Sequence, residues 1–126
     1  MTLPSEANGR TWIKLIRESL ASGRSFLFVA KNGKKPVGFA YGTVFWDFQF
    51  EVSQSIGLIN DVYVLPEFRG KGIGQKLVIE CLKKLKKEGI DLVRLTVLKH
   101  NESAVRLYEK LGFETYRYGM MQSLRH

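Results

Sequence analysis

The chain has 126 residues, enough for one compact domain over 1–126 with a single core and too few for two domains. Hydrophobic residues make up 44% and charged residues 25%, values that exclude a disordered or fibrous protein. Twenty Lys and Arg against twelve Asp and Glu give a net charge of +8, so we expect an anionic partner: nucleic acid, an anionic surface or a phosphorylated small molecule.

The beginning of the chain, MTLPSEANGR, lacks the charged and apolar regions of a signal peptide, and no apolar run reaches the length of a membrane span. A single cysteine, Cys81, excludes an internal disulfide and fits a reducing compartment. We therefore expect a cytoplasmic protein. Cys81 falls on the apolar side of a predicted helix, which favours buried packing over a nucleophilic role.

Apolar residues at helical spacing predict a first helix over 11–22 that ends at Gly23. Two β-rich runs follow, at 25–31 and 36–48. The letters NGKK between them begin with Asn-Gly, a strong signal for a hairpin turn. These runs predict two paired strands.

Small residues line one face of the second run, at Gly38, Ala40 and Gly42. Small side chains on this face allow a helix or a ligand to pack closely against it. A further strand is predicted over 56–65, where apolar residues alternate, and Pro66 stops it because proline has no N–H to donate.

The next predicted helix covers 73–88 and ends at Gly89. Its expected outer face carries Lys76, Glu80, Lys83 and Lys87. The run KKLKK within it is interpreted as a solvated face rather than a binding site.

The remainder predicts a mostly buried strand over 91–98, a helix over 101–111 and a closing strand over 113–124. Asn101 is the expected N-cap of that helix and Gly112 its C-cap. Together these elements describe an α/β domain with a mixed sheet and helices on its faces.

The stretch VYVLPEFRGKGIGQKLV joins a strand to a helix through three alternate glycines, Gly70, Gly72 and Gly74. A helix N-terminus presents unpaired amides and partial positive charge, and glycines let a phosphate come close to the backbone. Arg69 and Lys71 add full charges. The loop is typical of a diphosphate site, although it matches neither G-x-x-x-x-G-K-[ST] nor G-x-G-x-x-G.

RGKGIG, at 69–74, fits the R/Q-x-x-G-x-G/A signature of the GNAT superfamily of N-acetyltransferases, and NESAVRLYEKLGFE, at 101–114, resembles that family's second conserved block. The resemblance covers roughly Val37 to the C-terminus. It implies a mixed, mostly antiparallel central sheet flanked by helices, with a shortened N-terminal part that has room for about one helix. It also implies acetyl-CoA as co-substrate and no metal.

In that family the diphosphate lies on the amides of the glycine loop, and the pantetheine arm pairs with the preceding strand as an added strand would. The resemblance therefore implies a cofactor-binding set drawn from this strand, the loop and the later helix. Its members are Val62, Tyr63, Val64, Arg69, Gly70, Lys71, Gly72, Ile73, Gly74, Gln75, Asn101, Ser103 and Tyr108.

Acetyl transfer to an amine requires a neutral amine, a donor for the oxyanion and a proton for the departing thiolate. By resemblance, Tyr108 is the proton donor, although its place on an apolar stripe also suits a core tyrosine. The N–H of Val62 is the expected oxyanion donor. Asp61 is the first candidate for the base, acting through water, with Asn60 brought beside it if the strand bulges.

Two acidic residues of the stretch VFWDFQFEV, Asp47 and Glu51, are alternative bases whose other interpretation is a solvated loop or edge strand. Its aromatic and acidic side chains from Phe45 onward suit a cationic amine, or a dimer surface. An exposed sheet edge favours a homodimer.

The expected acceptor is a small-molecule or protein amine, and neither a membrane nor a nucleic acid is expected as partner. Two other functions remain open: a small basic nucleic-acid-binding domain, which would bind with steep salt dependence, and a CoA-binding module without catalysis.

Overall fold

The computed structural model describes residues 2–3, 13–19, 24–47 and 54–125. These residues fall into two compact units, Met1–Thr96 and Val97–His126, which are treated separately below. No helix in the described ranges is long and apolar enough to cross a membrane. The single-domain organisation, the cytoplasmic location and the homodimer stay predictions.

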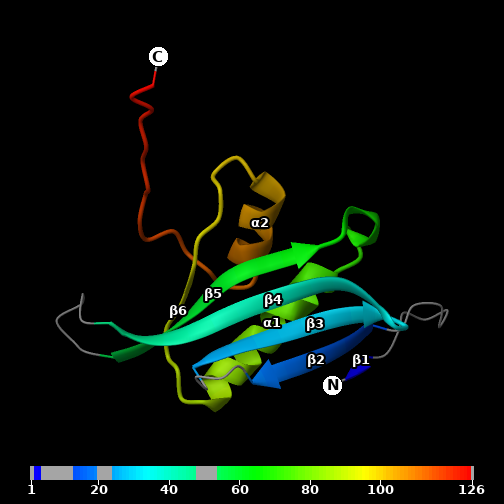
Figure 1. The fold of residues 1–126 in the computed structure, drawn as a ribbon. Helices are drawn as coiled ribbons and strands as arrows, with labels where there is room; N and C mark the ends of the chain where they lie inside the picture. Colours follow the sequence, from blue (N-terminus) through cyan, green and yellow to red (C-terminus); the bar gives the residue numbers. More distant parts are fainter. Residues whose placement is uncertain (1, 4–12, 20–23, 48–53, 126) are drawn as a thin grey trace. The chain divides into compact units, whose positions relative to one another are not determined.

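The first unit contains a six-stranded sheet in which the strands lie side by side in chain order (Figure 1). The first five strands pair antiparallel with their neighbours, and the last pairs parallel with the fifth. The predicted mixed, mostly antiparallel sheet is therefore confirmed. The strands are β1 Thr2–Leu3, β2 Ile13–Ser19, β3 Ser25–Asn32, β4 Lys35–Asp47, β5 Gln54–Val64 and β6 Val93–Leu95.

The helix predicted over 11–22 is wrong where the structure describes that stretch, because Ile13–Ser19 is strand β2. All seven residues pair with β3, from Ile13 opposite Asn32 to Ser19 opposite Phe26. Hydrogen bonding to the next strand, β3, outweighs the local helical spacing here. The predicted cap Gly23 lies outside the described residues.

The predicted hairpin is confirmed, with β3 and β4 joined through Gly33 at φ 62°. A bulge follows on β4, because Ala30 pairs with Gly38 whereas Lys31 pairs with Pro36, so Val37 is an extra residue. The carbonyl of Val37 accepts a hydrogen bond from the amide of Leu65 at 2.8 Å. The hairpin is thereby tied to the end of β5.

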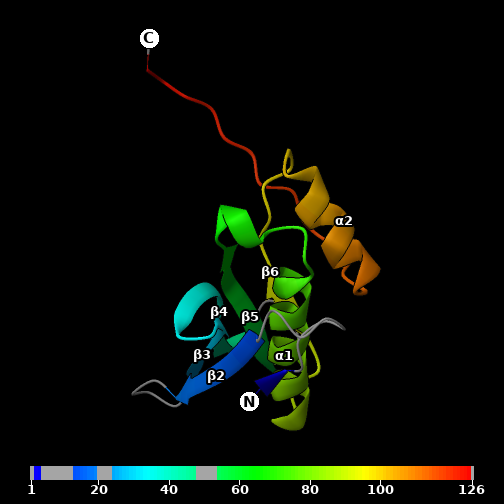
Figure 2. The same cartoon turned by 90° about the vertical axis from the view of Figure 1, so that its right-hand side faces the viewer.

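Helix α1, Ile73–Lys87, lies along one face of the sheet (Figure 2) and contacts β3, β4 and β5. Gly57 on β5 lets it approach closely, since a Cβ there would lie 2.8 Å from the methyl carbons of Leu85. The buried hydrophobic residues in the described part of this unit are Phe26, Phe28, Ala30, Val37, Ala40, Ile56, Ile59, Ile73, Leu77, Val78, Cys81 and Leu85.

The small face of β4 is closely packed, and its neighbour at Gly42 is an aromatic ring. A Cβ on Gly42 would lie 2.3 Å from the ring of Phe26. The ammonium group of Lys84 on α1 lies 5.5 Å from the same ring centroid. The small face thus serves packing.

One residue of α1 departs from the predicted outer face, because Glu80 is only 5% exposed. Lys83 lies 3.6 Å from its carboxylate, and the Lys side chain is itself 70% exposed. Glu80 is therefore a buried carboxylate at the boundary of the apolar face. The lysine run is otherwise solvated, with Lys83, Lys86 and Lys87 exposed and Lys84 paired to Glu88 at 2.7 Å.

The strand predicted over 91–98 forms only at Val93–Leu95, and it is half-buried rather than mostly buried. Its partners are Gly57–Ile59 of β5. Leu98 is 61% exposed. The strand is short because pairing with β5 stops at Leu95.

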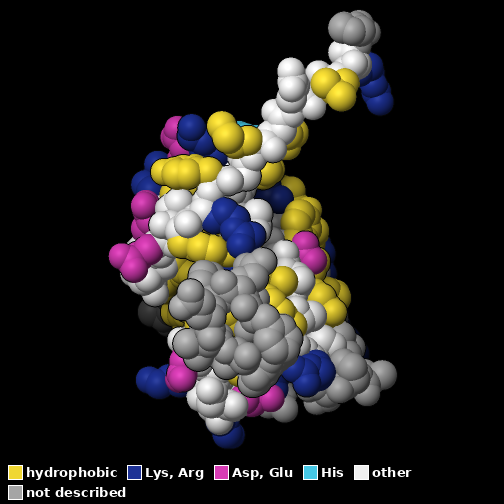
Figure 3. Space-filling model, turned by 90° about the vertical axis from the view of Figure 1, so that its left-hand side faces the viewer, with side chains coloured by type: hydrophobic (Ala, Val, Ile, Leu, Met, Phe, Trp, Pro, Cys, Tyr) yellow, Lys and Arg dark blue, Asp and Glu magenta, His cyan; other side chains and the backbone are white. Residues whose placement is uncertain are grey.

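In the second unit, helix α2 covers Glu102–Lys110, with Asn101 as N-cap as predicted. Gly112 follows with φ 99°. The strand predicted over 113–124 is wrong, since residues 113–125 have no regular secondary structure. Hydrophobic side chains are exposed along this segment (Figure 3): Tyr116, Tyr118, Met120, Met121 and Leu124.

Candidate functional site

The outer edge of β5 is open over its last residues. β6 pairs only with Gly57–Ile59, so no strand among the described residues pairs with Asn60–Val64 on that side. An open strand edge presents main-chain donors and acceptors to any extended ligand.

The register shows which main-chain groups point toward this edge. The amide of Leu65 donates to Val37 of β4, and main-chain groups alternate in direction along a strand. Val62 and Val64 therefore direct their N–H and C=O groups away from β4, while Tyr63 directs its own toward β4. Main-chain pairing at the open edge is thus available to Val62 and Val64 but not to Tyr63.

A bulge in β5 leaves two consecutive polar residues exposed, as expected if the strand bulges at Asn60. Tyr41 pairs with Asp61 and Gly42 with Ile59, so Asn60 is the extra residue. Asn60 and Asp61 are both exposed. The hydroxyl of Thr43 donates to Oδ1 of Asn60 at 3.0 Å, which directs the Asn60 amide nitrogen away from Thr43.

The glycine loop follows directly from β5 through a short 3₁₀ helix, η1, at Pro66–Phe68. Gly70 and Gly72 adopt φ 77° and 82°, so two of the three glycines have a left-handed conformation. Gly72 is the N-cap of α1, without a side-chain cap. The third glycine, Gly74, lies inside the helix.

The amides of this loop are not used internally. No hydrogen bond within the described part of the chain is donated by the N–H of residues 70 to 75, whereas the next amide, of Lys76, donates to Gly72 at 3.1 Å. A Cβ on Gly70 or Gly72 would meet nothing within 4 Å. The loop therefore presents a row of bare donors in open space, as an anion site requires.

The side chain of Arg69 links the glycine loop to the end of β5. Its Nε donates to the carbonyl of Val64 at 2.8 Å, and its guanidinium lies 5.4 Å from the ring centroid of Tyr63. The Val64 carbonyl is thereby occupied. At the open edge this leaves the amide of Val64 and both main-chain groups of Val62.

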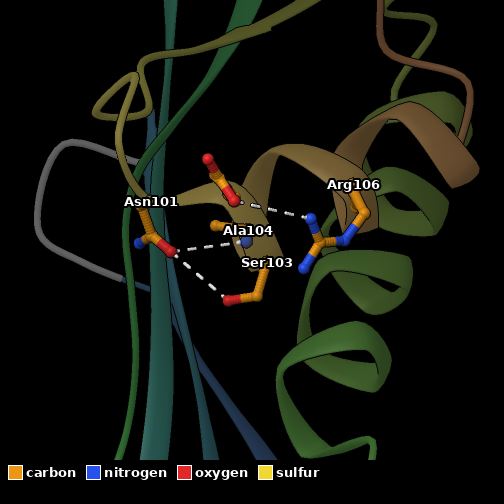
Figure 4. A network of polar contacts seen from close by, with 5 residues as sticks. Asn101, Ser103, Ala104 and Arg106 are labelled. Carbon is orange, nitrogen blue, oxygen red and sulfur yellow. Dashed lines mark hydrogen bonds and ion pairs between the residues drawn. The ribbon is translucent and has the colours of Figure 1, made fainter.

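In α2, the side chain of Asn101 caps the helix (Figure 4). Its Oδ1 accepts from the amide of Ala104 at 3.4 Å and from the hydroxyl of Ser103 at 3.4 Å. Arg106 lies 3.9 Å from the carboxylate of Glu102. Because the oxygen of Asn101 performs the capping, its amide nitrogen can serve a ligand.

Tyr108 lies on α2 seven residues after Asn101, as predicted. It is half-buried, and its ring packs edge-on against Phe113 with centroids 5.8 Å apart. The amide of Phe113 donates to the Tyr108 carbonyl at 2.9 Å. The ring is thus held by the turn that ends the helix.

Cys81 behaves as predicted from its position. Burial, and to a smaller extent the neighbouring Glu80 carboxylate, raises the pKa of its thiol to about 12. A thiol with this pKa is uncharged near neutrality and is a poor nucleophile. Cys81 is a core residue.

The predicted site residues fall into two groups. Those from Asn60 to Gln75 are contiguous on β5, η1 and the start of α1, whereas Asn101, Ser103 and Tyr108 belong to the second unit. Of the alternative bases, Asp47 ends β4 and Glu51 lies outside the described residues. No group of three His, Cys, Asp or Glu in the described ranges could hold a metal ion.

Three residues near the site were not assigned from the sequence. Thr43 orients Asn60, and it is opposite Leu58, close to the bulge on the neighbouring strand; this relation could have been found only with the strand register known. Lys35 and Phe68 meet beside the glycine loop, with the ammonium nitrogen 5.6 Å from the ring centroid. Their contact depends on the hairpin's position, which the sequence does not specify.

Residues 2–113 match the family model described as the acetyltransferase (GNAT) family. An uncharacterized N-acetyltransferase of Methanocaldococcus jannaschii is 37% identical over 69% of this chain and 38% of its own length. The mycothiol acetyltransferase of Thermobispora bispora is 37% identical over 75% of this chain and 32% of its own. The chain thus spans about a third of the length of these relatives.

Among solved structures, an aminoglycoside N-acetyltransferase in complex with CoA superposes with a TM-score of 0.68, at 20% identity, over 82% of this chain and 68% of that chain. This likeness shows a shared fold.

Proposed function

Because the chain belongs to the acetyltransferase (GNAT) family, we propose that it transfers an acetyl group from acetyl-CoA to a primary amine. The acyl donor's thioester supplies the activated acetyl group. The residues of this chain bind the donor and orient it. They also supply a proton to the leaving thiolate and accept a proton from the amine.

One observation carries the proposal: the row of bare amides from Gly70 to Gln75 directly after a strand whose outer edge is open. A diphosphate fits the amides because they are aligned at the positive end of α1. An extended amide-containing arm fits the edge because Val62 and Val64 direct main-chain groups there. Coenzyme A joins these two chemical features in one molecule.

At the reacting centre, the Val62 amide polarises the thioester carbonyl, and its direction toward the open edge supports this role. Tyr108 donates the proton to the leaving thiolate. A phenol with a pKa of about 10 can protonate a thiolate with a pKa of about 8.5 at modest cost.

The acceptor must lose a proton before it attacks, because a free alkyl ammonium has a pKa near 10.4. Asp61 accepts this proton through water. Its exposure beside the bulge supports this role, and the Asn60 amide, oriented by Thr43, can hold the water.

The test is a thiol-release assay with acetyl-CoA and a panel of amines: a polyamine, a small monoamine, a lysine peptide and a peptide with a free N-terminus. Mass spectrometry identifies the acetylated product. Cys81 adds little background because it is fully buried. We expect turnover with at least one acceptor, and about a 100-fold lower kcat for Tyr108→Phe with little change in KM for acetyl-CoA.

Binding of coenzyme A without turnover of any amine would favour a non-catalytic module. Binding of nucleic acid with steep salt dependence and no affinity for coenzyme A would overturn the proposal.

A further inference from the structure

Two lysines from different elements converge on one aromatic ring beside the glycine loop. The ammonium nitrogen of Lys71 lies 5.3 Å from the ring centroid of Phe68, and that of Lys35 lies 5.6 Å from the same centroid. Lys71 stands between Gly70 and Gly72, inside the row of bare amides. The pair therefore places two positive charges next to the proposed diphosphate site.

The backbone fixes this meeting point. Lys35 begins β4, two residues before Val37, whose carbonyl accepts from Leu65 at 2.8 Å. Phe68 lies three residues beyond Leu65, and its own amide donates to the Leu65 carbonyl at 2.9 Å. The β3–β4 hairpin thus brings a charge from a remote part of the sequence to the loop.

These charges are not neutralised within the described residues. No carboxylate in that part of the chain forms an ion pair with Lys35 or Lys71, although Glu67 precedes Phe68 in η1. Both lysines are exposed. An aromatic ring attracts a cation but does not balance its charge, so both ammonium groups can still pair with an anion.

We propose that Lys35 and Lys71, held on the ring of Phe68, bind the phosphate on the ribose 3′ carbon of coenzyme A and so favour it over its 3′-dephospho form. This inference rests on the proposed function. The ribose links that phosphate to the diphosphate, so a ligand seated on the amides of Gly70–Gln75 carries its third phosphate close to the loop. A side chain from within the loop and one from beside it can both reach such a group.

The test compares the affinities of coenzyme A and 3′-dephospho-coenzyme A by isothermal titration calorimetry, which requires no turnover. We expect the unmodified chain to bind coenzyme A about tenfold more tightly. Lys35→Met should reduce this preference to about threefold while affinity for the dephospho form stays within about twofold, and the Lys35→Met/Lys71→Met variant should abolish the preference. The preference should also shrink with added salt.

Lys34→Met is the matched control, because it removes an exposed lysine one residue away that makes no contact with the ring. It should leave the preference unchanged. Equal binding of the two ligands by the unmodified chain, or an equal effect of Lys34→Met and Lys35→Met, would overturn this inference while leaving the acetyltransferase proposal intact. Failure of both ligands to bind would overturn both.

Discussion

Two glycines at the start of α1 illustrate how much the site depends on single residues. Gly72 has φ 82° and faces open space, whereas Gly74 is helical and a Cβ there would lie 3.8 Å from a methyl carbon of Val64. The first position requires glycine for its conformation, and the second has room for a methyl group. Nothing in the spacing of the three glycines distinguishes them.

We predict that Gly72→Ala lowers the free energy of unfolding by about 1–2 kcal/mol, the cost of a left-handed conformation for a residue with a Cβ. It should also weaken coenzyme A binding by about tenfold, because the methyl group disturbs the row of amides. Gly74→Ala should change stability by less than about 0.5 kcal/mol or increase it slightly. Denaturant unfolding and calorimetric titration measure both; equal losses in the two variants would contradict the assigned conformations.

At the scale of elements, the sequence predicted best where local pattern and tertiary packing agree. Helix α1 forms at Ile73–Lys87 against a predicted 73–88, because its apolar stripe is both helical in period and buried on the sheet. Strand β2 was predicted as a helix because apolar residues three and four apart also fit that period. Its seven pairs with β3 join it to the next strand along the chain, and the spacing of apolar residues within 13–19 does not show that pairing.

The close packing of α1 against the sheet at Gly57 predicts how a substitution there changes stability. A methyl group on Gly57 would lie 2.8 Å from the methyl carbons of Leu85, which is fully buried and cannot easily move. We expect Gly57→Ala to lower the free energy of unfolding by about 1–3 kcal/mol through overpacking. Gly119→Ala is the matched control, since a Cβ there meets nothing within 4 Å, and it should stay within about 0.5 kcal/mol.

A double-mutant cycle assigns the cause. Leu85→Ala alone should cost about 2–5 kcal/mol, and combined with Gly57→Ala the total loss should be smaller than the sum, by about 0.5–3 kcal/mol. Additive losses in chemical denaturation would show that α1 does not press on β5 at this point.

For the whole chain, alternation alone could not predict where the sheet stops. The segment 113–124 alternates apolar and polar residues like a strand, yet in residues 113–125 the structure has no strand. A strand needs a partner for its hydrogen bonds, and a sequence pattern does not supply one. The motifs of the site were easier to recognise than its geometry. The glycine loop and the Asn101 cap could be predicted from the sequence. The bulge at Asn60 and the lysine pair on Phe68 depend on how the strands pair, which the sequence does not show.

The contrast between the helical core and this C-terminal segment predicts an order of proteolysis. Trypsin needs several residues in an extended conformation, which residues 113–125 already offer and α1 does not. Tyr118, Met120 and Met121, which follow Arg117, are at least 83% exposed.

We therefore expect the bond after Arg117 to be cut at trypsin concentrations that leave the bonds after Lys83, Lys86 and Lys87 intact. Intact-mass spectrometry over time follows both cleavages. Arg117→Gln should delay loss of this segment without changing cleavage in α1. Cleavage in α1 at the same rate as after Arg117 would mean that the helix opens as readily as the segment, and would contradict the packing described for the first unit.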